Sequence, residues 1–248
     1  MPVNLFLLSS SSVFGMSYME HAMDALKEFL DDERIVHFVP YALADYDGYT
    51  ASLQERLAPL GITVRGVHTF ASPRQAIEEA RVLYVGGGNS FRLLKTLQQH
   101  DLLDRVRQRV LDGELRYMGS SAGSNMACPS LRTTNDMPIV QPRSFEAFGL
   151  IPFQINPHYL DADANSTHMG ETRARRLEEF LEENDVPVLG MREGSWLRRS
   201  GSKLHLDGIA GARLFTRNAH PQEIVPGTDL SWMLETPANF DQPIVRNR

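Results

Sequence analysis

The chain has 248 residues, of which 42% are hydrophobic and 23% charged, and its formal net charge is −6. This composition is typical of a globular protein and argues against disordered or fibrous architectures. The negative charge offers no basic field to a nucleic-acid backbone. The single cysteine, Cys128, excludes an intrachain disulfide and a multi-cysteine zinc site.

The beginning of the chain lacks the pattern of a targeting signal. Its apolar residues 3–8 form a short run with no Lys or Arg before it, unlike a signal peptide. No stretch approaches the roughly 18 apolar residues of a membrane span. We therefore expect one domain over residues 1–248, in the cytoplasm, as a monomer or homodimer, with no membrane or nucleic-acid partner.

Short apolar runs alternate with amphipathic segments along most of the chain. The runs rich in β-branched residues predict strands at 3–8, 34–40, 62–69, 81–85, 115–118, 151–155 and 186–191. The amphipathic segments predict helices at 19–30, 52–60, 73–80, 90–111 (with a break near His100) and 172–183. Strands separated by helices favour an α/β fold with a mostly parallel sheet flanked by helices.

The pattern changes after Met191. Residues 195–200, 203–206 and 213–216 are short β-like runs joined by turns that contain glycine. They predict a C-terminal region of antiparallel hairpins at the edge of the sheet, within the same domain.

A run of three glycines follows the strand predicted at 81–85. Gly86-Gly87-Gly88-Asn89-Ser90 can turn sharply and present backbone N–H groups at the start of the next helix. Ligands of open parallel sheets bind beyond the carboxyl ends of the strands, which is where this loop lies. We expect Gly88 and Asn89 to contribute to a cradle for an anion or oxyanion, although a tight turn capped by Ser90 would also explain the pattern.

The strand predicted at 115–118 ends in Gly119-Ser120-Ser121-Ala122-Gly123. This sequence fits the G-x-S-x-G nucleophile elbow, in which a strained strand-to-helix turn projects the middle serine. Ser121 is that serine, and the backbone N–H of Ala122 would be an oxyanion donor. A plain helix N-cap at Ser121 is the alternative.

Two further strand ends carry a base and an acid. His158 follows the strand at 151–155, and Glu193 follows the strand at 186–191. Together with Ser121 they predict a Ser–His–Glu triad, in which the acid orients the base that activates the serine. The chain order of an α/β-hydrolase would instead use Glu193 followed by His205 or His220, which lie in an apparent hairpin and near the tail. Asp161 and Asp163 are local competitors for the acid.

Several motifs in matching order then identify a family resemblance. They are Val85-Gly86-Gly87-Gly88-Asn89, Gly119-Ser120-Ser121-Ala122-Gly123, residues 132–138 (Arg-Thr-Thr-Asn-Asp-Met-Pro), Asn156-Pro157-His158 and Gly170-Glu171-Thr172-Arg173. The chain resembles the peptidase E family of serine peptidases, the α-aspartyl dipeptidases, over nearly its whole length. The resemblance implies a flavodoxin-like fold related to the class I glutamine amidotransferases, hydrolysis of Asp-Xaa dipeptides, and the triad Ser121, His158 and Glu193 with no cofactor and no metal.

The same resemblance implies that residues 132–138 form a substrate-site loop. Asp136 could pair with the free amino group of a dipeptide, while Arg173, or else His168, could bind the aspartyl side chain. Two other functions stay open at this stage. One is a cyanophycinase-type serine hydrolase that acts on β-aspartyl linkages, and the other is a non-enzymatic module that binds an anion at the glycine loop.

Overall fold

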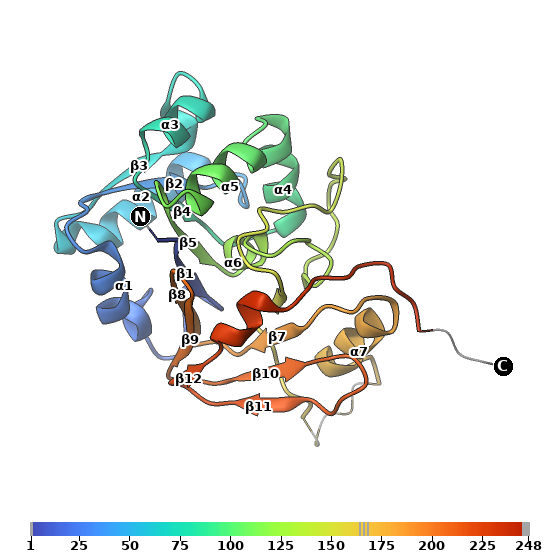
Figure 1. The fold of residues 1–248 in the computed structure, drawn as a ribbon. Helices are drawn as coiled ribbons and strands as arrows, with labels where there is room; N and C mark the ends of the chain where they lie inside the picture. The colour runs from blue at the N-terminus through green and yellow to red at the C-terminus, as the bar shows by residue number, and fades with distance from the viewer. Residues whose placement is uncertain (1, 164, 166, 168, 245–248) are drawn as a thin grey trace.

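The first sheet carries the parallel strands of the α/β fold. The computed structural model describes residues 2–163, 165, 167 and 169–244 (Figure 1). Five parallel strands lie in the spatial order β1-β5-β4-β2-β3. Their bounds are β1 (Asn4–Leu8), β2 (Ile35–Val39), β3 (Thr63–Gly66), β4 (Val82–Val85) and β5 (Arg116–Ser120). The carboxyl ends of these strands therefore share one rim of the sheet.

Helices cover both faces of this sheet, and the period of two along each strand explains why. In β1, Phe6 packs with one buried cluster and Leu7 with another. The first cluster includes residues of α1 (Met23–Leu30) and α2 (Tyr46–Leu57). The second includes residues of α3 (Pro73–Glu79), α4 (Ser90–Gln99), α5 (Leu103–Leu111) and α6 (Ala122–Met126). With both faces buried, the strands are almost continuously apolar.

An antiparallel extension continues the first sheet beyond β1. β8 (Ser195–Ser200) pairs with β1, and β9 (Lys203–Gly208) and β12 (Thr228–Asp229) follow it outward. Within the described residues, short 3₁₀ helices also lie at Glu20–Ala22, Ala58–Leu60, Val67–Thr69 and Ser231–Glu235.

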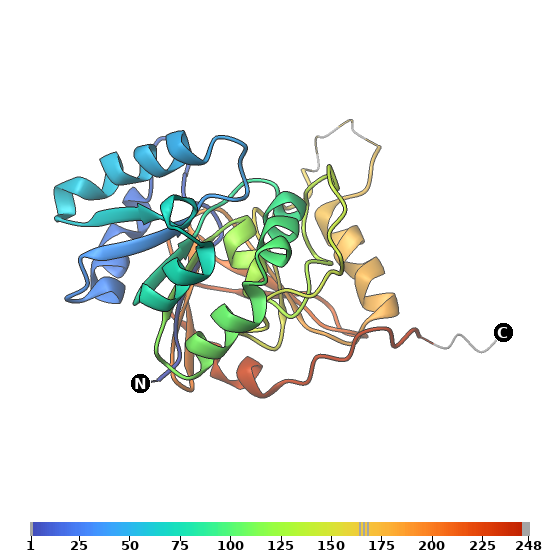
Figure 2. The same cartoon turned by 90° about the horizontal axis from the view of Figure 1, so that it is seen from above.

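A second, four-stranded sheet has the order β11-β10-β7-β6. It consists of β6 (Gln154–Asn156), β7 (Val188–Met191), β10 (Ala212–Phe215) and β11 (Gln222–Ile224). Helix α7 (Arg173–Glu183) packs on it through Leu177 and Leu181. Figure 2 shows α7 at the opposite end of the molecule from α1 and α2. The largest buried cluster contains residues of both sheets, and the single domain over residues 1–248 stays a prediction.

The predicted α/β class with its mostly parallel sheet is confirmed, and so is the helix break near His100, which falls between α4 and α5. Several details differ, among them the strand predicted at 62–69, which ends at Gly66 and continues as a 3₁₀ helix. Of the strands after residue 151, β6, β7, β10 and β11 form a second sheet, whereas β8, β9 and β12 extend the first. The strand predicted at 151–155 begins at Gln154, because Pro152 has no N–H for a sheet ladder. Helix α2 begins at Tyr46 rather than at 52, since the Asp45 side chain accepts the Gly48 N–H as its N-cap.

Membrane-spanning helices are absent from the described part of the chain, where no helix combines the length and the apolar character needed to cross a bilayer.

Candidate active site

Ser121 lies in the turn between β5 and α6. Its φ and ψ are 51° and −113°, a conformation that L residues rarely adopt and that costs on the order of 1–3 kcal/mol. The flanking glycines are required by close packing. A Cβ on Gly123 would lie 2.0 Å from the Val85 carbonyl oxygen, and one on Gly119 would lie 2.6 Å from the backbone of Gly123. The backbone geometry is therefore that of a sharp strand-to-helix elbow.

His158 and Glu193 meet Ser121 from the second sheet. The Ser121 Oγ lies 2.8 Å from His158 Nε2, and His158 Nδ1 lies 2.7 Å from Glu193 Oε1. His158 follows β6 and Glu193 follows β7, so adjacent parallel strands deliver them side by side. The side chains of His158 and Glu193 are 40% and 51% exposed, which leaves this part of the site open to solvent. The three residues that the sequence singled out thus form one hydrogen-bonded chain.

The residues that the sequence offered as alternative acids and bases make contacts elsewhere. Asp161 pairs with Arg192, and Asp163 accepts the N–H of Asn165 in its own loop. His205 is part of β9, and His220 is exposed. The hydrogen bonds at His158 therefore single out Glu193 as its carboxylate partner in the described structure.

The glycine loop lies against the elbow. A Cβ on Gly87 would be 3.2 Å from the Ser121 Cβ, and Gly88 has a φ of 131° that favours glycine. Asn89 holds the loop in place: its N–H donates to the Ala42 oxygen, its Oδ1 accepts the Arg92 N–H, and its Nδ2 donates to the Met137 oxygen. Because its Oδ1 accepts the Arg92 N–H, Asn89 is the N-cap of α4.

Asp136 lies at the start of α4. Its Oδ2 accepts hydrogen bonds from the Ser90 N–H at 2.7 Å and from the Ser90 Oγ at 2.5 Å. A carboxylate at a helix N-terminus stabilises the helix dipole and satisfies a free N–H group. Asp136 thereby links the segment 132–138 to the glycine loop.

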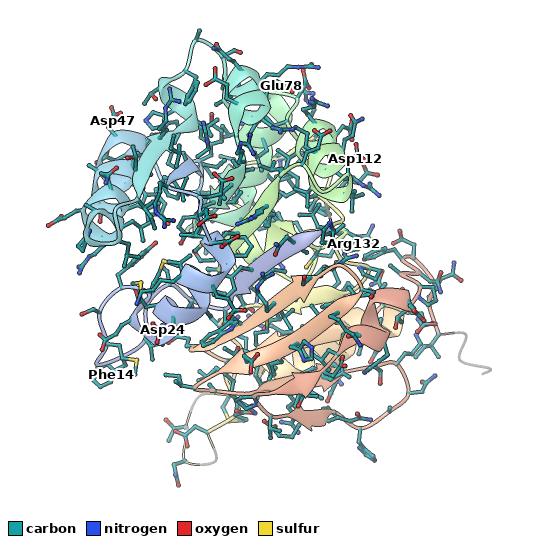
Figure 3. All side chains as sticks on the ribbon, turned by 60° about the vertical axis from the view of Figure 1, so that its left-hand side comes forward. Phe14, Asp24, Asp47, Glu78, Asp112 and Arg132 are labelled. Carbon is teal, nitrogen blue, oxygen red and sulfur yellow. The ribbon has the colours of Figure 1, made fainter. Side chains whose placement is uncertain are left out.

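Arg132, at the beginning of that segment, faces the C-terminal part of the chain. Its guanidinium forms a bidentate ion pair with Asp241, in which Nη1 donates to Oδ1 at 2.7 Å and Nη2 donates to Oδ2 at 3.1 Å. Figure 3 shows Arg132 near the boundary between the helix-covered strands and the second sheet. The segment is therefore held at both ends.

Arg173 is connected through the Asn135 side chain to the backbone next to His158. Its Nη1 donates to Asn135 Oδ1 at 2.7 Å, and Asn135 Nδ2 donates to the Pro157 oxygen, directly before His158. Desolvation by burial lowers the pKa of Arg173, the neighbouring Arg176 lowers it further, and Asp136 opposes both. Among the described residues, no carboxylate oxygen lies within ion-pair distance of the Arg173 guanidinium. The cation is thus half-buried and left with a neutral amide partner.

A cavity of about 540 Å³ lies beside Arg173. Its lining includes Leu160, Asp163, Glu171 and Arg176.

His168, the alternative cation, lies outside the described residues. Within the described part of the chain, no three His, Cys, Asp or Glu side chains form a group that could hold a metal ion. The absence of a cofactor and of a metal stays a prediction.

Sequence reasoning missed several residues that hold the site together. Ser9 follows β1 and its Oγ accepts the N–H of His158, a contact that no motif in the sequence indicated. The strand-end rule that selected His158 could have selected Ser9 as well. Arg192 and Asp161 join the loops that carry Glu193 and His158, yet their pairing has no local sequence signal.

Comparisons with known proteins agree with the predicted family. A sequence model of peptidase family S51 matches residues 5–207. A peptidase E from Streptomyces coelicolor is 57% identical over 239 residues, covering 96% of this chain and 98% of that protein. A probable alpha-aspartyl dipeptidase from Drosophila melanogaster is 49% identical over 234 residues, covering 94% and 98%.

Solved structures agree with the flavodoxin-like α/β fold. A putative peptidase E protein from Listeria monocytogenes superposes with a TM-score of 0.64 at 22% identity, covering 85% of this chain and 100% of that chain. A peptidase from an acI-B1 actinobacterium gives a TM-score of 0.65 at 17% identity, covering 93% and 97%. The sequence matches confirm the resemblance seen in the motifs: the chain belongs to peptidase family S51 and is a serine peptidase.

Proposed function

We propose that this serine peptidase hydrolyses dipeptides with an N-terminal aspartate through the triad Ser121, His158 and Glu193. The observation that carries the proposal is the chain of contacts from Ser121 Oγ to His158 Nε2 and from His158 Nδ1 to Glu193 Oε1, at 2.8 and 2.7 Å. The name of the Drosophila relative, a probable alpha-aspartyl dipeptidase, supports the substrate class.

The mechanism follows from the positions of these atoms. His158 Nε2 accepts the Ser121 proton as Oγ attacks the scissile carbonyl, while Glu193 holds the Nδ1–H tautomer and stabilises the imidazolium that forms. His158 then gives the proton to the leaving amine, which departs as the second amino acid. Water, activated by the same imidazole, hydrolyses the aspartyl-enzyme ester and restores the free serine.

Backbone N–H groups of Ala122 and Gly88 would stabilise the oxyanion. The Ala122 N–H is at the N-terminus of the short helix behind Ser121, and the Gly88 loop lies against the same turn. Asn89 would contribute by fixing that loop, since its own N–H already donates to Ala42. Losing one such donor typically lowers kcat by roughly 10²–10³-fold.

Arg173 would bind the carboxylate of the aspartyl side chain. A half-buried guanidinium with an amide partner gains a charge-assisted, two-pronged contact when a carboxylate arrives. Asp136 would receive the free amino group of the dipeptide, which favours dipeptides over internal peptide bonds. His168 remains the alternative cation of the proposal.

The cytoplasmic location and the monomeric or dimeric state also stay predictions.

Turnover of a small panel of peptides tests this function. We expect the wild type to cleave Asp-Leu and Ser121→Ala to lose turnover while retaining its fold. Ser120→Ala is the matched control, because the Ser120 Oγ hydrogen-bonds Tyr84 rather than His158. Preference for β-Asp-Arg over Asp-Leu would move the enzyme to the β-aspartyl hydrolases. Unchanged activity in Ser121→Ala would remove Ser121 as the nucleophile.

The role of Arg173 has its own control on the same helix. We expect Arg173→Ala to lose kcat/KM for Asp-Leu, whereas Arg175→Ala should keep it, since Arg175 pairs with glutamates on the surface of α7. A fluorophosphonate probe distinguishes the binding-module alternative: absence of labelling at Ser121, together with a phosphate-dependent thermal shift, would favour binding over catalysis.

A further inference from the structure

The end of β1 touches the backbone of all three loops that carry the proposed triad. The Leu8 oxygen accepts the N–H of Ser121 at 3.1 Å. One residue on, the Ser9 N–H donates to the Ser195 oxygen at 3.0 Å, at the end of the loop that holds Glu193. The Ser9 Oγ accepts the N–H of His158 at 3.0 Å. These contacts join positions up to 186 residues apart.

The Ser9 hydroxyl is a bridge between the base and the strand that leads to the acid. Ser9 is completely buried. Its Oγ accepts from the His158 N–H and donates to the Met191 oxygen at 2.7 Å. Met191 ends β7, two residues before Glu193, and its oxygen also accepts the Tyr159 N–H at 2.9 Å. The hydroxyl therefore acts both as a donor and as an acceptor at this junction.

The bond from His158 to Ser9 holds an unfavourable backbone conformation. The φ of His158 is 53°, in the left-handed region that residues other than glycine rarely adopt. Such a conformation persists only where the surrounding contacts impose it. The φ of a residue also sets the direction of its Cβ, so relaxation at His158 would swing the imidazole relative to Ser121 and Glu193.

We propose that Ser9 is a positioning residue for His158: its buried hydroxyl fixes the left-handed backbone that aims the imidazole between Ser121 and Glu193. This inference rests on the proposed triad and adds to it a residue from the opposite sheet. The hydrogen bonds of the Ser9 hydroxyl go to backbone atoms of Met191 and His158, so its removal should impair the chemical step rather than the affinity for substrate.

Two variants of Ser9 test the role on Asp-Leu. Ser9→Ala removes the hydroxyl. Ser9→Cys keeps a side chain of similar size and supplies only a weak donor and acceptor, so it decides the question if the alanine variant folds poorly. The control is Ser10→Ala, because Ser10 is also buried but its Oγ bonds within its own loop, to Ser12.

We expect kcat to fall by roughly 10²-fold in both Ser9 variants, as for a misplacement of about 1 Å in a catalytic group. KM should stay unchanged, the rate of fluorophosphonate labelling at Ser121 should fall in parallel, and Ser10→Ala should behave as the wild type. Wild-type kcat in both Ser9 variants, or an equal loss in Ser10→Ala, would overturn the inference. Ser121→Ala separates the two proposals: if it is inactive while the Ser9 variants are fully active, only the role of Ser9 fails.

Discussion

The two halves of the proposed triad are built in different ways. The elbow at Ser121 is fixed by backbone packing, with glycines so close to their neighbours that no side chain fits. His158 and Glu193 stand instead on loops of the second sheet, half exposed and held by side-chain contacts from distant residues. Figure 1 shows β1 between the helix-covered strands and the lower strands β7, β10 and β11.

This difference predicts where each half is vulnerable. Close packing resists motion but tolerates no added atom. The exposed His158–Glu193 pair keeps its geometry only through the hydrogen bonds that hold its two loops. Its charges are also partly screened by solvent. Steric changes should therefore destroy the elbow, whereas changes to charge or hydrogen bonding should weaken the acid–base pair by degrees.

Gly123→Ala should have the largest effect. The added Cβ would lie 2.0 Å from the Val85 oxygen, so β4 and α6 must separate. We expect the free energy of unfolding to fall by about 3 kcal/mol or more, beyond the usual cost of overpacking, together with loss of labelling at Ser121. Urea unfolding followed by circular dichroism measures the first quantity.

Gly61→Ala is the matched control for that substitution. Gly61 has a φ of 71° but no atom within 4 Å of its would-be Cβ, so only backbone strain of about 1–2 kcal/mol applies. If Gly123→Ala were no more destabilising than Gly61→Ala, close packing would not be what fixes the elbow.

Glu193→Gln should lower kcat by roughly 10²-fold, less than the approximately 10⁴-fold loss known for a buried triad acid. The amide can no longer stabilise the imidazolium, but the 51% exposure of Glu193 lets water supply part of that stabilisation. Steady-state kinetics on Asp-Leu measure the loss. Glu183→Gln, on the exposed end of α7, is the control and should be unaffected. A loss as large as that of Ser121→Ala would contradict the view of an open, screened pair.

Asp161→Asn should have a smaller effect on the same half of the site. Asp161 accepts two hydrogen bonds from Arg192, at 2.7 and 3.1 Å, and so ties the loop of His158 to that of Glu193. This contact is partly exposed, and we expect kcat to fall by up to about fivefold, equivalent to about 1 kcal/mol. Asp24→Asn, which removes an exposed ion pair with Lys27 on α1, should keep wild-type kcat, and equal losses in both variants would argue against a role of the Asp161–Arg192 pair in positioning the two loops.

The same carboxylate adds a pH dependence that the Asp161→Asn variant should lack. The hydrogen bond from Arg192 lowers the pKa of Asp161. Its stabilising contribution is therefore present above the ordinary pKa of an aspartate and is lost as the pH falls through the lowered value. Acid unfolding curves of wild type and variant should converge at the lowest pH.

Substitution of His37, which lies in the first sheet, should have the smallest effect, and this effect is on the pH dependence of stability. It is buried in β2, and its two ring nitrogens have no hydrogen-bond partner among the described residues. Burial lowers the pKa of His37, with Arg65 acting in the same direction. The unfolded chain therefore binds this proton more readily, and the free energy of unfolding should fall as the pH drops below about 6.5.

His37→Phe should flatten that slope, though not abolish it, because burial also lowers the pKa of His21. Denaturant unfolding between pH 5 and 8, with exposed His220→Phe as control, measures the change. An identical slope in wild type and His37→Phe would exclude His37 as the titrating group.

Local patterns predicted most of the elements and the residues that meet at the candidate site. Ser121, His158 and Glu193 each follow a strand, and the strand-end rule needs only the sequence around each of them. The start of α2 was misplaced because Tyr46, Asp47 and Gly48 are weak helix formers, and the cap at Asp45 compensates for them. The β-rich runs predicted strands, but not which of two sheets each strand would join.

The α/β class, the glycine-flanked elbow and the family could all be predicted from the amino-acid sequence, because each depends on motifs whose residues are close together in the chain. The tertiary structure was needed to show that β6 and β7 belong to a separate sheet whose rim faces the elbow. It alone revealed that Ser9 bonds His158 across 149 positions and that Asp161 pairs with Arg192. The residue type alone fixes what a side chain can donate or accept, whereas the packing of the whole chain decides which group becomes its partner.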